Sequence, residues 1–540
     1  MIMRHLNSIS VLGIMAAAFA VPAHAESNNS EGPTTTIQPY IDVSQVLSAE
    51  LTPGDEVVTF TQIAVGVDLN TQGRNSGASV SLRYERNIGY DDNTVDSDTI
   101  SGIARGSLAI VPRAVTLEAG ALASRTRVDG GGGVSGNPLV SEDAESRIYS
   151  GFAGPSFATR AGSVDITGAA RVGYTRFETD TNLVNPAGDN IDAFDESTSY
   201  SGQIRAGTQA GDPLPVGVGV TAGAFQEDIS NLDQRVRDLY VRGDVTVPIT
   251  DNFAVVGGIG YEDVEVSSRD ALRDVNGDPI LDEDGRFVTD TASPRQIAFE
   301  ADGLIWDVGV TWSPSSRTSL AATVGRRYDS TTYYGSFSYQ PDRRSSLNVS
   351  VYDGITGLGG ALTDSLSGLS NDFDVIRNPF TGDLGGLIGD NESVGLTGNL
   401  GSIRSAAFRN QGVAASYQRR IGRVSAGIGA GYNRREFIGA EGTVLEAIDG
   451  VSDENYYVTA GASSPLGQSG TIAGNAYLNL FESGFDGGDV TGYGASAAYN
   501  RSITRKLSAR AALGVDYIDS EFTDEDFAVA SALLGLRYDF

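Results

Sequence analysis

The sequence predicts an all-β fold: a single transmembrane antiparallel β-barrel of about 22 strands, with short periplasmic turns and long extracellular loops. The first observation behind this prediction is the C-terminal stretch 527–540, F-A-V-A-S-A-L-L-G-L-R-Y-D-F. It alternates between apolar and polar or small positions up to the terminal Phe540. The second is that segments with the same period of two recur along the chain. The third is that the connections between these segments alternate between short and long.

The N-terminus is typical of a secreted protein. Arg4 and His5 precede an apolar run at 11–21, and Ala23-His24-Ala25 has the small residues of a cleavage site. The run is too short to span a bilayer, so we expect residues 1–25 to be a signal peptide and residues 26–540 the mature barrel. This predicts export across the inner membrane and a location in the cell outer membrane.

Composition excludes most enzyme classes. Both histidines, His5 and His24, fall in the predicted signal peptide, and the chain has no cysteine. A mature chain without either residue has no Ser-His or Cys-His nucleophile pair and lacks the usual ligands of zinc, copper and iron. We therefore expect no enzyme activity and no cofactor.

The charge balance also limits the partners. The formal net charge is −31, and without Arg4 the chain has 37 basic and 69 acidic residues. Such a surface repels nucleic acid. No later stretch supplies 18 consecutive apolar residues, so a membrane-spanning chain of this sequence must use strands.

The alternating segments predict about 22 strands, with an uncertainty of two either way. An even number agrees with single-chain bacterial barrels. The candidate strands are residues 35–48, 57–70, 76–89, 99–111, 114–128, 146–159, 162–177, 197–210, 214–228, 235–249, 252–267, 298–313, 317–328, 332–340, 345–353, 409–421, 423–437, 453–464, 469–482, 489–502, 506–519 and 526–540.

The connections fall into two sets. Short ones such as Val111-Pro112-Arg113 and Ile421-Gly422 are expected on the periplasmic rim, together with both chain termini. Only about ten residues lie between Ala25 and the first predicted strand, which leaves no room for an N-terminal plug domain of the kind carried by TonB-dependent receptors. The longer, mostly acidic connections, expected outside the cell, include 89–98, 129–145, 178–196, 268–297, 354–408 and 438–452.

The polar face of each strand should line the lumen if the apolar face meets lipid. Charges of both signs predict a wet interior that orients polar solutes, although the same residues could instead pair across strands and hold the wall together. The candidate lumen-lining residues are Arg83, Glu85, Glu118, Asp165, Arg171, Arg205, Arg242, Asp244, Asp307, Arg510 and Asp516.

The longest connection, 354–408, has a helical pattern. Leu358, Leu362, Leu366 and Leu369 recur at helical spacing, with Asp364 on the opposite face. One hypothesis is that this loop folds into the mouth and narrows the pore. The alternative is a mobile external loop.

One acidic stretch in the loop 268–297 is a weak calcium candidate. Oxygen ligands at alternating positions suit calcium, but Gly277 is misplaced for an EF-hand and no bidentate glutamate follows. An acidic hairpin with an Asn-Gly turn is the alternative interpretation. The candidate ligands are Asp274, Asn276, Asp278, Asp282 and Asp284.

The closing strand resembles the signal that the barrel-assembly machinery reads. Its alternating residues are Leu534, Leu536, Tyr538 and Phe540. The assembly machinery is therefore an expected partner during biogenesis.

Several stretches resemble outer-membrane proteins of sphingomonad-type α-proteobacteria. They are T-I-Q-P-Y-I-D-V-S-Q-V-L-S-A-E-L (36–51), R-Y-E-R (83–86), T-R-V-D-G (126–130), D-Q-R-V-R-D-L-Y-V-R-G-D-V-T-V-P (233–248), the acidic stretch 273–290, D-G-L-I-W-D-V-G-V (302–310), S-T-T-Y-Y-G-S-F-S-Y-Q-P (330–341) and A-L-L-G-L-R-Y-D-F (532–540). The chain is similar to the β-barrel porin 2 type, which overlaps proteins associated with PEP-CTERM/exosortase exopolysaccharide systems. Some relatives are labelled preprotein translocase subunit, a small single-helix inner-membrane protein that this sequence does not fit.

The function predicted from these features is a porin-like barrel for the passive passage of small polar solutes. A second reading is export or surface attachment of an exopolysaccharide or a PEP-CTERM-type protein. A third is a structural or adhesive surface barrel without transport. Outer-membrane lipid and lipopolysaccharide are the expected surroundings.

Overall fold

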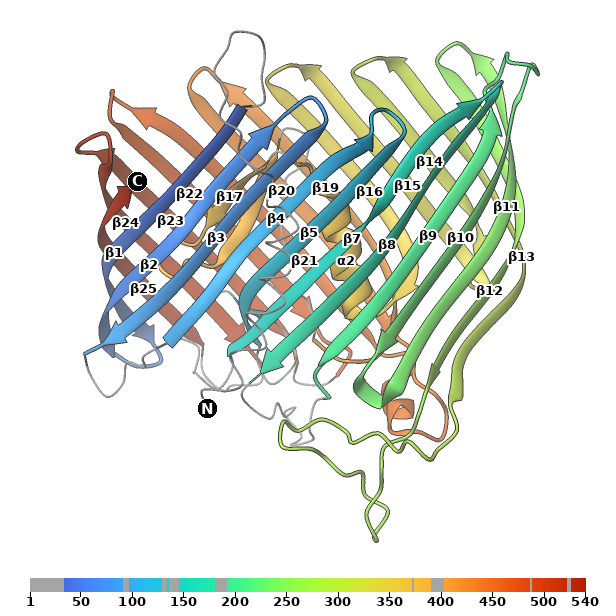
Figure 1. The fold of residues 1–540 in the computed structure, drawn as a ribbon. Helices are drawn as coiled ribbons and strands as arrows, with labels where there is room; N and C mark the ends of the chain where they lie inside the picture. Colours follow the sequence, from blue (N-terminus) through green and yellow to red (C-terminus); the bar gives the residue numbers. More distant parts are fainter. Residues whose placement is uncertain are drawn as a thin grey trace.

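The computed structural model describes residues 34–90, 97–128, 134–135, 145–179, 192–371, 373–389, 403–485, 488–521 and 526–540. The predicted signal peptide lies outside these described residues. The described chain forms a closed antiparallel barrel of 22 strands (Figure 1), which confirms the predicted fold class. The wall strands are β1 (Thr34–Thr52), β2 (Val57–Gln72), β3 (Ser76–Gly89), β4 (Ser97–Val111), β5 (Val115–Val128), β7 (Glu145–Ala161), β8 (Val164–Thr179), β9 (Glu196–Thr208), β10 (Gly217–Ile229), β11 (Gln234–Thr250), β12 (Phe253–Ser268), β13 (Gln296–Ser315), β14 (Thr318–Arg327), β15 (Ser330–Asp342), β16 (Ser345–Thr356), β19 (Phe408–Ile421), β20 (Val424–Phe437), β21 (Ser452–Leu466), β22 (Gly470–Glu482), β23 (Val490–Ser502), β24 (Leu507–Ser520) and β25 (Phe527–Asp539).

The barrel closes where the first strand meets the last. β1 pairs with β2 on one side and with β25 on the other, in a register that runs from Tyr40 opposite Asp539 to Thr52 opposite Ala528. Closure matters because an open sheet edge would leave backbone N–H and C=O groups without partners in lipid.

Each strand carries the two faces that the alternation predicted. On β1, Ile41 and Val43 are 38% and 45% exposed on the outside, whereas Asp42 and Ser44 are buried on the inside. An apolar exterior around a polar interior is the arrangement that lipid requires of a closed barrel, and it places the chain in the outer membrane. Secretion through a signal peptide remains a prediction.

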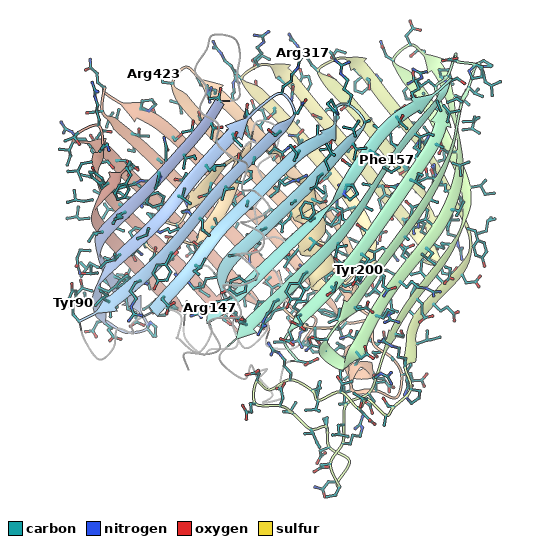
Figure 2. The ribbon with its side chains drawn as sticks, in the orientation of Figure 1. Tyr90, Arg147, Phe157, Tyr200, Arg317 and Arg423 are labelled. Carbon is teal, nitrogen blue, oxygen red and sulfur yellow. The ribbon has the colours of Figure 1, made fainter. Side chains whose placement is uncertain are left out.

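The two rims differ as expected. Arg317 and Arg423 mark the short-turn rim in Figure 2, and the strand directions bring Thr34 and Phe540 to this same rim. The segregation is not complete, because Tyr328 and Asp329 alone join β14 to β15 on the long-loop rim. Both residues have φ of 52°, the left-handed conformation of a tight hairpin turn.

The described part of the connection between β16 and β19 does not extend away from the barrel. It contains α2 (Leu358–Gly368) and a hairpin of β17 (Phe373–Arg377) and β18 (Leu384–Gly389), all inside the barrel in Figure 1. The leucines with helical spacing lie in or directly after α2, and Asp364 is exposed on its other face. We call the described residues 357–371, 373–389 and 403–407 the inserted segment.

The remaining elements lie in connections. They are β6 (Val134–Ser135), which pairs with the end of β5, and the short 3-10 helices η2 (Asn231–Asp233) and η4 (Val444–Ile448). No helix in the described part of the chain is long and apolar enough to cross a membrane.

Candidate functional site

The inserted segment begins with a helix whose N-terminus rests on a buried carboxylate of the wall. Glu227 on β10 is 0% exposed and accepts hydrogen bonds from the backbone N–H groups of Gly357 and Gly360, at 2.7 and 2.8 Å. Its oxygens also accept from the hydroxyls of Ser197 and Thr356, at 2.9 and 3.2 Å. A carboxylate here satisfies N–H groups that lack partners within the helix and complements the positive end of the helix dipole.

A guanidinium on β4 holds the opposite end of the helix. Arg105 donates to the carbonyls of Leu369 and Ser367, both at 3.3 Å, and pairs with Glu118 at 2.9 Å. A cation beside the last carbonyls complements the negative end of the dipole. The wall therefore supplies the charge that each end of α2 requires.

The apolar face of α2 packs on the wall between these charges. Leu358 and Leu362 join a buried cluster with Ile148 and Phe177 of β7 and β8. Leu366 joins a second cluster on β4, β5 and β7. Burial of such side chains is favourable by about 2 kcal/mol each, so apolar packing and charged caps hold the same helix.

The hairpin that follows α2 is held by arginines. Arg125 of β5, with a side chain 3% exposed, donates to both carboxylate oxygens of Asp383 at 3.1 and 3.3 Å and to the carbonyl of Thr381 at 3.0 Å. From the hairpin itself, Arg377 donates to the hydroxyl of Ser101 at 2.7 Å. Bidentate arginine–carboxylate pairs are among the stronger and more directional polar contacts.

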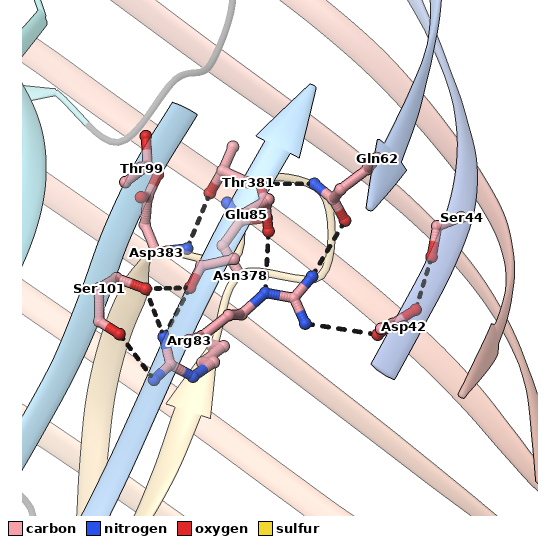
Figure 3. Close-up of polar contacts among 12 residues, drawn as sticks. Asp42, Ser44, Gln62, Arg83, Glu85, Thr99, Ser101, Asn378, Thr381 and Asp383 are labelled. Atoms are coloured by element: carbon pink, nitrogen blue, oxygen red, sulfur yellow. Dashed lines mark hydrogen bonds and ion pairs between the residues drawn. The ribbon is translucent and has the colours of Figure 1, made fainter. Parts of the chain in front are cut away.

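A buried ion-pair network lies next to this hairpin (Figure 3). Arg83 donates to Glu85 at 2.8 Å and to Asp42 at 3.4 Å, and all three side chains are nearly fully buried. Gln62 joins the network to the inserted segment, because its amide donates to Glu85 at 2.7 Å and to the carbonyl of Phe380 at 2.9 Å. Breaking one partner of such a buried pair costs about 3–5 kcal/mol.

Phe380 carries the inserted segment to the barrel seam. Its ring packs on Val46, Ala512 and Leu533 of β1, β24 and β25. The inserted segment thus contacts wall strands from β10 down to β1 and, across the seam, β25 and β24. It lies across the lumen rather than along one strand.

The structure places the predicted lumen residues on the inward face, where they pair with one another. Arg205 binds Asp244 at 2.5 and 2.7 Å, and Arg242 bridges Asp244 at 3.0 Å to Asp307 at 2.5 Å. Their selection of solutes remains a prediction. The other contacts are Glu118 with Arg171, Asp165 with Arg160, Arg510 with Asp42, and Asp516 with Tyr477.

Loops of the long-loop rim hold the last part of the inserted segment. The amide of Phe194 donates to the carbonyl of Ile403 at 2.8 Å, and the hydroxyl of Ser405 donates to Asp192 at 2.5 Å. Asn231 and the amide of Phe287 donate to the other oxygen of Asp192, at 3.1 and 3.3 Å. Burial raises the pKa of Asp192, and these hydrogen bonds oppose the increase.

The carboxylate oxygens of the calcium candidates accept hydrogen bonds from backbone amides of the same loop. Asp274 accepts from the amides of Asn276 and Asp278 at 2.8 and 3.0 Å, which lowers its pKa, and Asp282 accepts from the amide of Asp284 at 2.9 Å. These contacts form two successive Asx-stabilised turns. Within the described ranges, no three acidic, histidine or cysteine side chains come together to hold a metal.

The predicted assembly residues form part of the outer face. Leu534, Leu536, Tyr538 and Phe540 are 71%, 50%, 40% and 61% exposed. Their recognition by the assembly machinery stays a prediction.

Sequence reasoning missed the wall residues that hold the inserted segment: Arg105, Arg125 and Glu227. Each occupies an inward position of a predicted strand, so the alternation could have identified them as lumenal. No local signal marked their partners, which lie more than a hundred residues away along the chain.

No protein-family model matches this chain, and no curated protein matches it. Similar solved structures include the FrpB iron transporter from Neisseria meningitidis (F5-1 variant), at 12% identity over 93% of this chain and 82% of that one, TM-score 0.44. They also include the ferric-catecholate import receptor Fiu from E. coli K12 in its open form, at 11% identity over 92% and 81%, TM-score 0.45. The copper transporter OprC has 11% identity over 96% and 82%, TM-score 0.41.

The prediction of a passive, porin-like passage is wrong. In this chain the lumen holds the inserted segment, bound to strands on both sides of the barrel seam. The physical reason for the correction is that many of the charges read as a solute path are partners of the chain's own segment or of one another.

Proposed function

We propose that this chain is a gated outer-membrane uptake barrel. The inserted segment closes the lumen at rest, and a polar ligand passes when the segment moves aside. The observation that carries the proposal is the capping of α2 by Glu227 at one end and Arg105 at the other.

The nature of the docking contacts supports movement. The inserted segment is joined to the wall at both ends, through β16 and β19, so it can leave its site without leaving the molecule. Many of its contacts are hydrogen bonds and ion pairs, which a polar ligand or water can replace. A segment with a fully apolar interface would have no such substitute.

Conductance in planar bilayers tests the gate. Wild type is expected to stay closed in potassium chloride apart from brief openings, whereas deletion of residues 358–400 should give a steady, large conductance. Steady conductance of wild type at the level of the deletion variant would overturn the proposal.

A reversible lock provides the matched control. The hydroxyls of Ser199 on β9 and Thr363 on α2 are 3.3 Å apart, and the chain has no cysteine of its own. The double variant Ser199→Cys/Thr363→Cys should lose its brief openings when oxidised and regain them on reduction. Openings that persist in the oxidised variant would show that α2 is not the moving part.

A further inference from the structure

One part of the inner wall carries no charge over the middle of six consecutive wall strands, β16 and β19–β23. Outward residues such as Val351, Tyr456 and Val458 are exposed, which sets the inward phase of these strands. We call the inward residues of this region the uncharged wall. They are every second residue, counted from the first, of 346–352, 412–418, 427–433, 455–461, 473–479 and 492–498.

Three tyrosine rings of the uncharged wall lie over glycines of a neighbouring strand. A Cβ on Gly431 would be 2.5 Å from Cζ of Tyr457. A Cβ on Gly494 would be 2.6 Å from Cε1 of Tyr477 and would also meet Asp516 of β24, at the edge of the uncharged wall, to which the Tyr477 hydroxyl donates at 2.9 Å. Tyr352 covers Gly412 in the same way. A ring in this position lies along the wall and turns one face to the lumen.

Asparagine amides flank these rings. Asn433 donates to the hydroxyl of Tyr352 at 3.0 Å. The register places Asn433 opposite Asn455, and Tyr457 opposite Asn479. The amides thus alternate with the rings on the same face.

Two of the amides have unused hydrogen-bonding atoms. Asn455 is 3% exposed, and among the described residues neither its amide nitrogen nor its amide oxygen has a hydrogen-bond partner. The side-chain oxygen of Asn479, 8% exposed, also has none within that part of the chain. An aromatic ring packed over a strand glycine stabilises the sheet by itself, and this accounts for the three tyrosines. It does not account for buried amides without hydrogen-bond partners, because such groups are costly in a folded protein.

We infer that the uncharged wall binds a neutral oligosaccharide. A pyranose ring presents an apolar face of C–H groups, which packs on an aromatic ring, and hydroxyls at its edge, which exchange hydrogen bonds with amides. A wall without charge gives no electrostatic advantage to an ionised ligand. The inference deepens the proposed function, because it names the ligand that the gate admits.

Binding of defined hexasaccharides tests the inference. Maltohexaose, cellohexaose and chitohexaose are titrated by calorimetry and saturation-transfer NMR into the purified full chain and into the variant without residues 358–400. Hexagalacturonate of the same length is the charged comparison. At least one neutral hexasaccharide is expected to bind the deletion variant, and hexagalacturonate is expected to bind more weakly.

Two neighbouring tyrosines supply a matched pair of variants. Tyr457→Ala removes a ring from the uncharged wall and should weaken binding about tenfold. Tyr456→Ala removes the next ring, which is 37% exposed on the outer face, and should leave binding unchanged. Asn455→Leu, which removes the unused amide, should also weaken binding.

Three results would overturn the inference: no neutral hexasaccharide binds the deletion variant, hexagalacturonate binds as tightly, or Tyr456→Ala weakens binding as much as Tyr457→Ala. These results are independent of the gate. If the deletion does not raise conductance but a saccharide still binds, the proposed gate is wrong and the saccharide site is retained.

Discussion

The inner wall of this barrel has two parts with different chemistry. Strands β1–β5 and β7–β14 carry inward charges such as Arg83, Arg125 and Glu227, whereas β16 and β19–β23 carry the uncharged wall of tyrosine, asparagine and glycine. Among the described residues, the side-chain hydrogen bonds and ion pairs that the inserted segment makes inside the barrel are with the first part. Inward charge in this molecule therefore marks where the chain binds itself. The uncharged part is where aromatic rings, and amides unpaired within the described chain, are available to the proposed ligand.

The largest expected effect comes from removing the carboxylate that caps α2. Glu227→Ala leaves four hydrogen-bond donors around one buried position without an acceptor, and should weaken docking of the inserted segment by about 3 kcal/mol. Hydrogen exchange of the α2 amides should become much faster. Asn455→Ala, on the uncharged wall, should leave this exchange unchanged. Equal protection of α2 in both variants would contradict the division of the wall into two parts.

A smaller effect is expected from two glycines of α2. A Cβ on Gly359 would lie 3.0 Å from Cβ of Thr175 on β8, in addition to meeting Ser197, whereas a Cβ on Gly368 would meet nothing within 4 Å. Gly359→Ala should therefore lift the helix from the charged part of the wall at a cost of about 1–3 kcal/mol. Gly368→Ala should be neutral or slightly stabilising. The open fraction in conductance recordings measures the difference. If the two variants behave alike, close packing at Gly359 is not part of the gate.

The smallest effect is expected at the long-loop rim, where the last residues of the inserted segment are held. The pKa of Asp192 is raised in the folded protein by burial, so its ionisation lowers stability as pH rises from its unfolded to its folded pKa. Asp192→Asn cannot ionise. The variant should resist proteolysis of the rim more than wild type at neutral pH, and the two should become equal in acid.

Asp274 provides the comparison of opposite sign. Its pKa is lowered by backbone hydrogen bonds, so its stabilising effect is present at neutral pH and is lost as pH falls through the folded pKa. Asp274→Asn should therefore be the weaker protein at neutral pH. If Asp192→Asn and Asp274→Asn change the pH dependence of rim proteolysis in the same direction, burial does not raise the pKa of Asp192.

The charged residues predicted to line the lumen form ion pairs or hydrogen bonds on the inward face in the structure, rather than an open path for solutes. The alternation placed Arg205, Arg242 and Asp244 on one face, and the structure has them there as a ladder. The prediction of an open passage is wrong because the inserted segment lies inside the barrel, bound to Glu227, Arg105 and Arg125 of the wall. The inward residues of β20–β22 give no charge signal in the sequence, because glycine, tyrosine and asparagine are neutral.

Strand number, strand faces and the two rims could be predicted from residue order, because the period of two is a local property of a polypeptide in a sheet. The helical spacing of Leu358, Leu362 and Leu366 is local in the same sense. The position of the inserted segment inside the lumen is not determined by local sequence. Arg125 meets Asp383 across 258 residues of sequence, and Glu227 meets Gly360 across 133. Such pairs exist after the barrel has closed around the segment, and for that reason the three-dimensional fold was needed to separate a plugged barrel from an open one.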